Sequence, residues 1–112
     1  MTCLRIGSSI VGLFATLAAT LPVVVAADPN PAADLAERRG CLHCHTPDRP
    51  HLGPAFRSVA DRYRGDPEAE TRLLDWLETG GRGHWGDDYE MSAQEHLGPS
   101  DAQTLVLWIL RQ

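Results

Sequence analysis

Two cysteines and a histidine stand close together in this sequence, where Cys41, Cys44 and His45 form the pattern C-x-x-C-H. If the segment is helical, the two thiols lie about one turn apart, and together they can reach the two vinyl groups of a single porphyrin. A histidine directly after the second thiol is then carried beneath the ring, where its imidazole can bind the iron. The pattern therefore predicts one covalently attached haem c, bound through Cys41 and Cys44 and ligated by His45.

Three other chemistries also use a closely spaced pair of cysteines. A thioredoxin-like redox pair is expected beside a βαβ unit, which this sequence does not predict. A zinc site could combine both cysteines with two of the three nearby histidines, His43, His45 and His51. A plain disulfide between Cys41 and Cys44 is the third alternative. The histidine that ends the motif, its helical surroundings and an export signal favour haem over these alternatives.

The chain before the motif is predicted to be helical and the chain after it to be a loop. Asn30 followed by Pro31 is typical of a helix start, and a short apolar stripe then ends at Gly40, directly before the cysteines. Residues 46–54 contain three prolines and a glycine and predict a loop. The motif is thus expected between a short helix and an irregular segment.

Three further helices are predicted from apolar residues that recur at helical spacing. The second runs from Ala55 to Gly65, the third follows Asp66-Pro67 and ends at Gly80, and the fourth follows a capping box of Ser100 and Gln103. Residues 80–99 are glycine-rich and acidic without a clear period and are expected to form a loop. No segment alternates convincingly with period two, so the sequence predicts an all-α fold of about four short helices around one haem. Trp76 and Trp108 are expected to pack in its core.

Length and charge narrow the possible functions. With 112 residues, 43% of them apolar and 22% charged, the chain can form one small folded domain. All ten basic residues are arginines, against fifteen Asp and Glu, and the formal net charge is −5. Because nucleic-acid binding depends on dense positive charge, this composition argues against a nucleic-acid partner.

The first 27 residues predict an export signal. Arg5 supplies one positive charge, residues 6–27 contain no charged side chain, and small residues precede Asp28. We place the cleavage site after Ala27, which leaves residues 28–112 as the mature chain, and expect export to the periplasm. If the segment were retained instead, its length would just suffice for a membrane anchor.

Several segments of the predicted mature chain resemble the class I c-type cytochromes, especially the small bacterial members. These segments are LAERRGCLHCH over 35–45, Gly53-Pro54, Gly83-His84-Trp85-Gly86 and DAQTLVLWILRQ over 101–112. The resemblance implies a monohaem cytochrome c domain over 28–112, in which the N-terminal and C-terminal helices cross. It also implies that the Pro54 carbonyl accepts a hydrogen bond from the His45 ring, and that Trp85 lies near a haem propionate.

The sixth iron ligand is assigned to Met91. This is the only methionine that remains after cleavage, it lies 46 positions beyond His45, and the resemblance places the distal methionine of the family in this loop. A thioether prefers ferrous iron, and His/Met ligation raises the reduction potential. His96 as ligand and a vacant sixth site remain alternatives, whereas His51 and His84 are expected at the surface or in loop hydrogen bonds.

Iron with both axial positions filled offers no open site to a small-molecule substrate, so we expect single-electron transfer between redox partner proteins rather than enzymatic activity. A diffusible periplasmic carrier is the expected function. A cytochrome subunit of a larger periplasmic oxidoreductase is the main alternative, and a gas-binding or peroxidatic haem protein is a third. Asp87, Asp88 and Glu90, beside Met91, form either an acidic docking face for a basic partner or merely a solvated loop.

Overall fold

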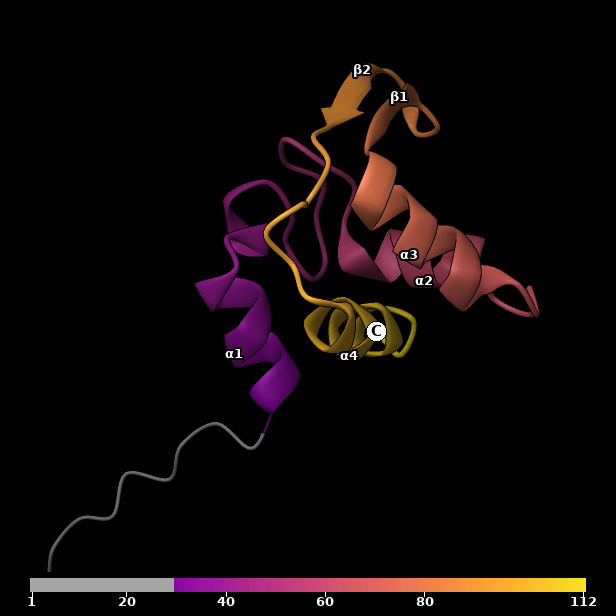
Figure 1. The fold of residues 1–112 in the computed structure, drawn as a ribbon. Coiled ribbons are helices and arrows are strands. Elements are labelled where there is room, and N and C mark those ends of the chain that lie inside the picture. The colour runs from indigo at the N-terminus through magenta and orange to yellow at the C-terminus, as the bar shows by residue number, and fades with distance from the viewer. Residues whose placement is uncertain (1–29) are drawn as a thin grey trace, which may run out of the picture.

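The computed structural model describes residues 30–112, and the predicted export signal lies outside them. The described residues form four α-helices, one 3₁₀ turn and a small antiparallel sheet of two strands (Figure 1). In chain order the elements are α1 (Pro31–Arg38), η1 (Cys41–His43), α2 (Phe56–Arg62), α3 (Ala69–Thr79), β1 (Gly81–Gly83), β2 (Gly86–Met91) and α4 (Pro99–Ile109). The predicted four-helix, mostly helical fold is confirmed, and the sheet is an addition to it. None of the described helices is long and apolar enough to cross a membrane.

The start of α1 matches the prediction from sequence. The Asn30 side chain accepts hydrogen bonds from the backbone N–H groups of Ala32 and Ala33, each at 3.3 Å, and Pro31 occupies the first turn. At the other end, Gly40 adopts a left-handed conformation with φ of 80°. This conformation favours glycine, and it turns the chain from α1 into η1, which carries Cys41.

The third helix begins later than predicted. The Asp66 carboxylate accepts a hydrogen bond from the backbone N–H of Glu68 at 2.9 Å, which closes a short turn, and α3 starts only at Ala69. Aspartate side chains form such turns as readily as they cap helices, because both use the same bond from carboxylate to nearby N–H. The Asp66-Pro67 signature therefore marks the approach to the helix rather than its first turn.

The predicted capping box at the fourth helix is wrong. Helix α4 begins at Pro99 with Gly98 before it and no side-chain cap. Gln103 instead donates a hydrogen bond to the carboxylate of Glu70 on α3 at 2.8 Å. Proline at the first helical position supplies the start signal, and the glutamine joins two helices across their exposed faces.

The predicted loop over residues 80–99 contains the hairpin of β1 and β2. In its register Gly81 pairs with Met91 and Arg82 with Glu90, and a bulge lies between Arg82 and Gly83. Sequence periodicity missed these strands because both are short and largely exposed, so no alternation between buried and exposed side chains marks them. The arginine and glutamate side chains of the central pair also form an ion pair.

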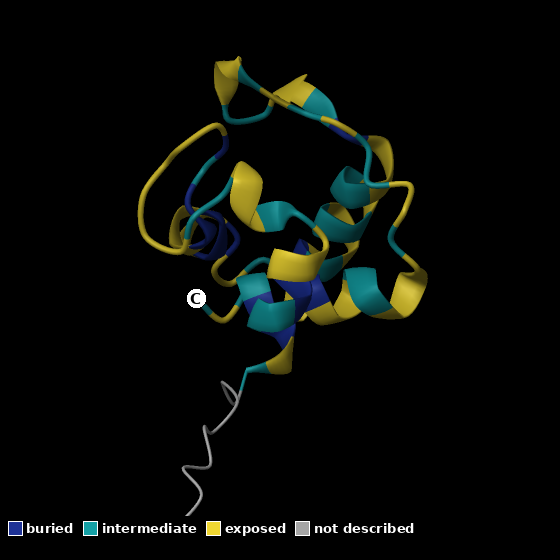
Figure 2. Cartoon of the chain, turned by 90° about the vertical axis from the view of Figure 1, so that its left-hand side faces the viewer, coloured by how far each residue is buried: buried dark blue, intermediate teal, exposed yellow. Residues whose placement is uncertain are grey.

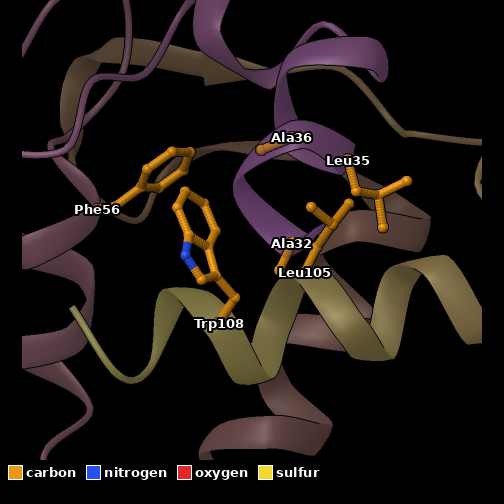
Figure 3. Packing of buried hydrophobic residues seen from close by; sticks show 6 residues of the cluster. All are labelled: Ala32, Leu35, Ala36, Phe56, Leu105 and Trp108. Carbon is orange, nitrogen blue, oxygen red and sulfur yellow. The ribbon is translucent and has the colours of Figure 1, made fainter. Parts of the chain in front are cut away.

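Helix α4 packs against all three other helices and organises the core. The largest cluster of buried side chains joins α1, α2 and α4 (Figure 3), and it consists of Ala32, Leu35, Ala36, Phe56, Leu105 and Trp108. Ala36 is fully buried, and Trp108 extends from α4 to meet Phe56 edge-on with ring centroids 5.1 Å apart. A small residue on α1 thus leaves room for a large one on α4, which confirms the predicted core position of Trp108. Figure 2 shows the contrast with the hairpin, whose residues are exposed or half-buried.

Candidate haem site

A cavity of about 530 Å³ lies between the η1 turn, the loop that follows it, α3 and the hairpin. This volume is typical of a site for a small molecule or cofactor. Much of its wall is apolar, with contributions from Val59, Leu73, Leu77, Val106 and Ile109. All six residues assigned to the cofactor line this one cavity, namely Cys41, Cys44, His45, Pro54, Trp85 and Met91.

The two cysteines enter the cavity from η1 and the residue that follows it. They are not joined by a disulfide, and Cys41 is half-buried whereas Cys44 is exposed. Burial raises the pKa of the Cys41 thiol above its ordinary value, the neighbouring Cys44 adds to the rise, and a backbone hydrogen bond opposes it. Both sulfur atoms are therefore available for bonds to a cofactor, and Cys41 is held as the neutral thiol.

His45 is held from two sides. Its Nδ1 lies 2.7 Å from the carbonyl oxygen of Pro54, and its ring stacks on Phe56 at a centroid distance of 5.1 Å with an interplanar angle of 19°. Since a carbonyl can only accept, Nδ1 carries the proton and Nε2 keeps its lone pair for a metal. The hydrogen bond that the family resemblance implied for Pro54 is thus present.

Gly53 contributes to this arrangement through its lack of a side chain. A Cβ atom at Gly53 would lie 2.6 Å from Cε1 and 2.9 Å from Nδ1 of His45, closer than atoms in contact can approach. The backbone can therefore pass directly over the imidazole and bring the Pro54 carbonyl to Nδ1. Sequence analysis identified the Gly-Pro pair but not this close approach, because spacing alone does not show which ring the glycine meets.

Met91 lines the cavity as the last residue of β2 and is half-buried. Its backbone is fixed by pairing with Gly81 and by the neighbouring Gly80, where φ is 63°. A Cβ atom at Gly80 would lie 2.5 Å from the Met91 carbonyl oxygen. The rival ligand His96 is exposed and is not among the residues that line the cavity; its Nε2 lies 3.4 Å from the backbone oxygen of Arg39.

A sequence profile of the cytochrome c family matches residues 31–112. The chain belongs to the cytochrome c family. Cytochrome c-551 of Allochromatium vinosum is 40% identical over 84 residues, which cover 73% of this chain and 88% of the relative. Cytochrome c-551 of Pseudomonas aeruginosa is 33% identical over 78 residues, which cover 70% of this chain and 73% of the relative. The relatives identify this cytochrome as a small class I bacterial type.

Solved structures give the same assignment for the fold. The crystal structure of Nitrosomonas europaea cytochrome c552 matches with a TM-score of 0.66 and 33% identity, covering 70% of this chain and 95% of that chain. The class 1 cytochrome MtoD from Sideroxydans lithotrophicus ES-1 matches with a TM-score of 0.58 and 30% identity, covering 77% of this chain and 97% of that chain. Proteins of this family carry covalent haem c and act in electron transfer with redox partner proteins, so the cofactor of this cytochrome is one haem c.

The residues around the cavity fit that cofactor. Two cysteines without a disulfide and an imidazole whose Nδ1 is bonded to Pro54 line the cavity, and Met91 supplies a thioether to the same cavity. The zinc alternative has no support, because the described residues contain no group of three or more His, Cys, Asp or Glu side chains placed to hold a metal ion. A thioredoxin-like pair would need a βαβ unit, and the two described strands form an antiparallel hairpin.

Contacts around His84, beside the cavity and the hairpin, join residues that sequence analysis did not bring together. His84, expected at the surface or in a loop hydrogen bond, lines the cavity with Nε2 2.7 Å from the Tyr63 hydroxyl. Arg62 donates a hydrogen bond to the backbone oxygen of His84 at 2.6 Å, and its guanidinium lies 4.6 Å from the ring centroid of Trp85. These partners are 21 or more positions apart along the chain, so no local pattern pairs them.

Trp76 also belongs to this cavity wall, which corrects its expected place in the core. It is half-buried, and its ring centroid lies 5.0 Å from that of His84. Gly81 passes close to it, since a Cβ there would lie 2.9 Å from Cη2 of the indole. Trp76 was expected in the core because large aromatic side chains usually pack there, but its ring borders the cavity instead.

Proposed function

We propose that this protein is a periplasmic single-haem electron carrier with His45 and Met91 as the two axial iron ligands. The observation that carries the proposal is that His45, with Nδ1 bonded to the Pro54 carbonyl, and Met91 line the same largely apolar cavity. When bound there, haem c supplies one-electron chemistry between ferric and ferrous iron.

The roles of the chain's own residues follow from their contacts. Cys41 and Cys44 attach the porphyrin, and His45 presents Nε2 to the iron. The hydrogen bond to the Pro54 carbonyl fixes the orientation of the ring and raises the basicity of the ligating nitrogen. Met91 has no proton to gain, so it stays a ligand at mildly acidic pH, where a histidine in its place would be lost.

Exclusion of substrate is part of the proposal. With two protein ligands on the iron, no position is open to a small molecule, so we expect a carrier rather than an enzyme. The reduced protein should accordingly bind carbon monoxide slowly. Rapid binding would indicate a vacant or easily displaced sixth ligand, and the gas-binding or peroxidatic alternative would then be favoured.

The negatively charged rim of the cavity favours a redox partner with a basic surface. Asp87, Asp88 and Glu90 are exposed and line the cavity, and the charge of Glu90 is partly offset by its ion pair with Arg82. Excess negative charge at the point where the cofactor reaches the surface would attract a positively charged protein and speed encounter. We therefore expect electron exchange with a basic redox protein to slow as salt is added, whereas faster exchange would contradict the assignment.

A subunit role in a larger periplasmic oxidoreductase is the second candidate, favoured by one side chain. Leu52 is 64% exposed and lies on the cavity rim. An apolar side chain at that point would be covered in a permanent complex. Purification of the native protein under mild conditions distinguishes the two, since a carrier elutes alone and a subunit elutes with a larger protein.

One experiment tests the central assignment. The full chain is produced with haem maturation and recovered from the periplasmic fraction, and its mass, N-terminus and absorption are recorded. The expected protein starts at Asp28, carries one haem and shows the far-red sulfur-to-iron band of ferric haem with a methionine ligand. A His96→Gln variant should keep this band. Absence of the band in the native protein at neutral pH would overturn the assignment of Met91.

A further inference from the structure

His84 is the one histidine besides His45 among the residues that line the cavity. Aromatic rings surround it, with Trp76 at 5.0 Å, Tyr63 at 6.1 Å and Trp85 at 6.1 Å between ring centroids. It is half-buried, so one part of the imidazole faces the other rings while another part stays within reach of water. His84 thus borders both the proposed haem cavity and the solvent.

The groups packed around His84 come from α2, α3 and the hairpin. Tyr63 supplies a hydroxyl 2.7 Å from Nε2, Arg62 supplies a positive charge beside the backbone of His84, and Trp76 and Trp85 supply neutral rings. Partial burial lowers the pKa of His84, and the charge of Arg62 lowers it further. Both effects favour the neutral imidazole relative to that of a free histidine.

Either protonation state of His84 can be satisfied by the same neighbour. Neutral Nε2 accepts a hydrogen bond from the Tyr63 hydroxyl, and protonated Nε2 donates to the oxygen of that hydroxyl, whose proton rotates away. The 2.7 Å contact is therefore compatible with both protonation states of His84.

We propose that His84 is a redox-linked proton site, whose affinity for a proton from solvent rises when the haem iron gains an electron and falls when the iron is oxidised. The inference rests on the proposed function, since it requires haem in the cavity that His84 lines. The electron comes from the protein donor and reduces ferric to ferrous iron, while the proton comes from water and adds to a neutral imidazole. When the iron is oxidised again, the electron leaves to an acceptor protein and the proton returns to water, so charge and atoms balance.

The physical reason is the change of charge inside one cavity. Reduction removes one unit of positive charge from the site, so a second positive charge on His84 becomes less unfavourable. The apolar wall of Val59, Leu73 and Val106 screens this interaction less than water would. The other charged groups near His84 are the carboxylates of Asp87 and Asp88 on the rim of the cavity and the guanidinium of Arg62.

The test measures His84 directly and then the potential. Proton NMR of the imidazole gives its pKa in the ferric and ferrous proteins, and we expect the ferrous value to be higher by about half a unit, as for a unit charge acting across a partly screened site. The reduction potential of the haem should then fall by about 30 mV in total as the pH rises past the two pKa values of His84. A full pKa unit would correspond to about 59 mV for a one-electron couple, and half a unit to half of that.

Two variants make the result specific. His84→Gln should remove the pH dependence of the potential in this range, while the matched control His96→Gln, at an exposed histidine that is not among the cavity-lining residues, should keep it. Equal pKa values of His84 in the two oxidation states, or an unchanged pH dependence in His84→Gln, would overturn the inference. Such results in protein that shows the far-red band would leave the proposed ligation intact, whereas loss of the band in the native protein would count against the proposed function itself.

Discussion

The two walls of the haem cavity are built in different ways. The part of the cavity that holds His45, here called the His45 wall, is supported by aromatic packing. The His45 ring stacks on Phe56, and Phe56 packs against Trp108 in the buried core. Gly53 approaches the imidazole closely, and the Pro54 carbonyl oxygen lies 2.7 Å from its Nδ1. The position of this ligand is therefore determined by the same side chains that hold α1, α2 and α4 together.

In the part of the cavity that holds Met91, here called the Met91 wall, backbone contacts rather than side-chain packing fix the position of the residue. Met91 ends a short, largely exposed strand, and it is fixed by pairing with Gly81 and by the close approach of Gly80 (Figures 1 and 2). No residue of this strand belongs to a buried cluster. A change in the His45 wall should consequently affect folding and haem retention, while a change in the Met91 wall should affect ligation and potential with the fold retained.

The largest expected effect comes from loss of the cofactor that both walls share. A Cys41→Ser, Cys44→Ser variant cannot attach haem, and the apolar side chains around the cavity then face water. Haem contacts are worth on the order of 10 kcal/mol before entropic costs, which exceeds the stability expected of so small a core. We expect a largely unfolded chain by far-ultraviolet circular dichroism. A cooperative thermal transition with near-native helix content would contradict this.

The next largest effect is expected in the His45 wall at Gly53. A Gly53→Ala variant places Cβ 2.6 Å from Cε1 of His45, so either the ring or the backbone must move. We expect a loss of about 1–3 kcal/mol in the free energy of unfolding and a lower yield of holoprotein. Denaturant unfolding of the holoprotein measures the first quantity, and haem content per chain the second.

Gly98→Ala is the matched control for that variant. Nothing lies within 4 Å of a Cβ at Gly98, and its φ is −70°. The expected change is below about 1 kcal/mol, because alanine is only a poorer residue at the helix start. If both variants lost equal stability, the close approach of Gly53 to His45 would not be the cause.

Features that depend on residues close together in the sequence could be predicted from the sequence alone. Cys41, Cys44 and His45 lie within five positions, so their spacing alone predicted their common site. The helices followed from a period of 3.6 residues, and Met91 from being the only methionine outside the export signal. All six predicted site residues line the cavity, although their bonds to haem stay a prediction.

The features that sequence missed depend on the packed fold. The contact between Gly53 and His45, the pairing of Tyr63 with His84 and the place of Trp76 in the cavity wall arise only when helices and loops come together. The capping box failed because Gln103 found a partner on α3 instead. The hairpin was missed because exposed strands lack the alternation that marks half-buried ones.

Removal of the distal ligand should change the electronic properties of the haem more than the fold. In a Met91→Ala variant we expect loss of the far-red band, a lower reduction potential and faster carbon monoxide binding by the reduced protein, since the thioether that favours ferrous iron is gone. Helix content should stay near the native value, because Met91 lies outside the buried clusters. Retention of the band in this variant would exclude Met91 as the ligand.

The smallest effect is expected from alanine variants in the hairpin, which shift Met91 but keep its side chain. They test whether backbone contacts fix the position of this ligand. Gly80 and Gly83 both have positive φ, at 63° and 83°, so alanine at either position introduces backbone strain, on the order of 1–3 kcal/mol. Only at Gly80 does the new Cβ meet the chain at Met91, 2.5 Å from its carbonyl oxygen, while at Gly83 nothing lies within 4 Å. We expect Gly80→Ala to weaken the far-red band and lower the temperature at which it disappears, and Gly83→Ala to preserve the band. Equal loss of the band in both variants would mean that hairpin strain in general, rather than the contact with Met91, controls the ligand.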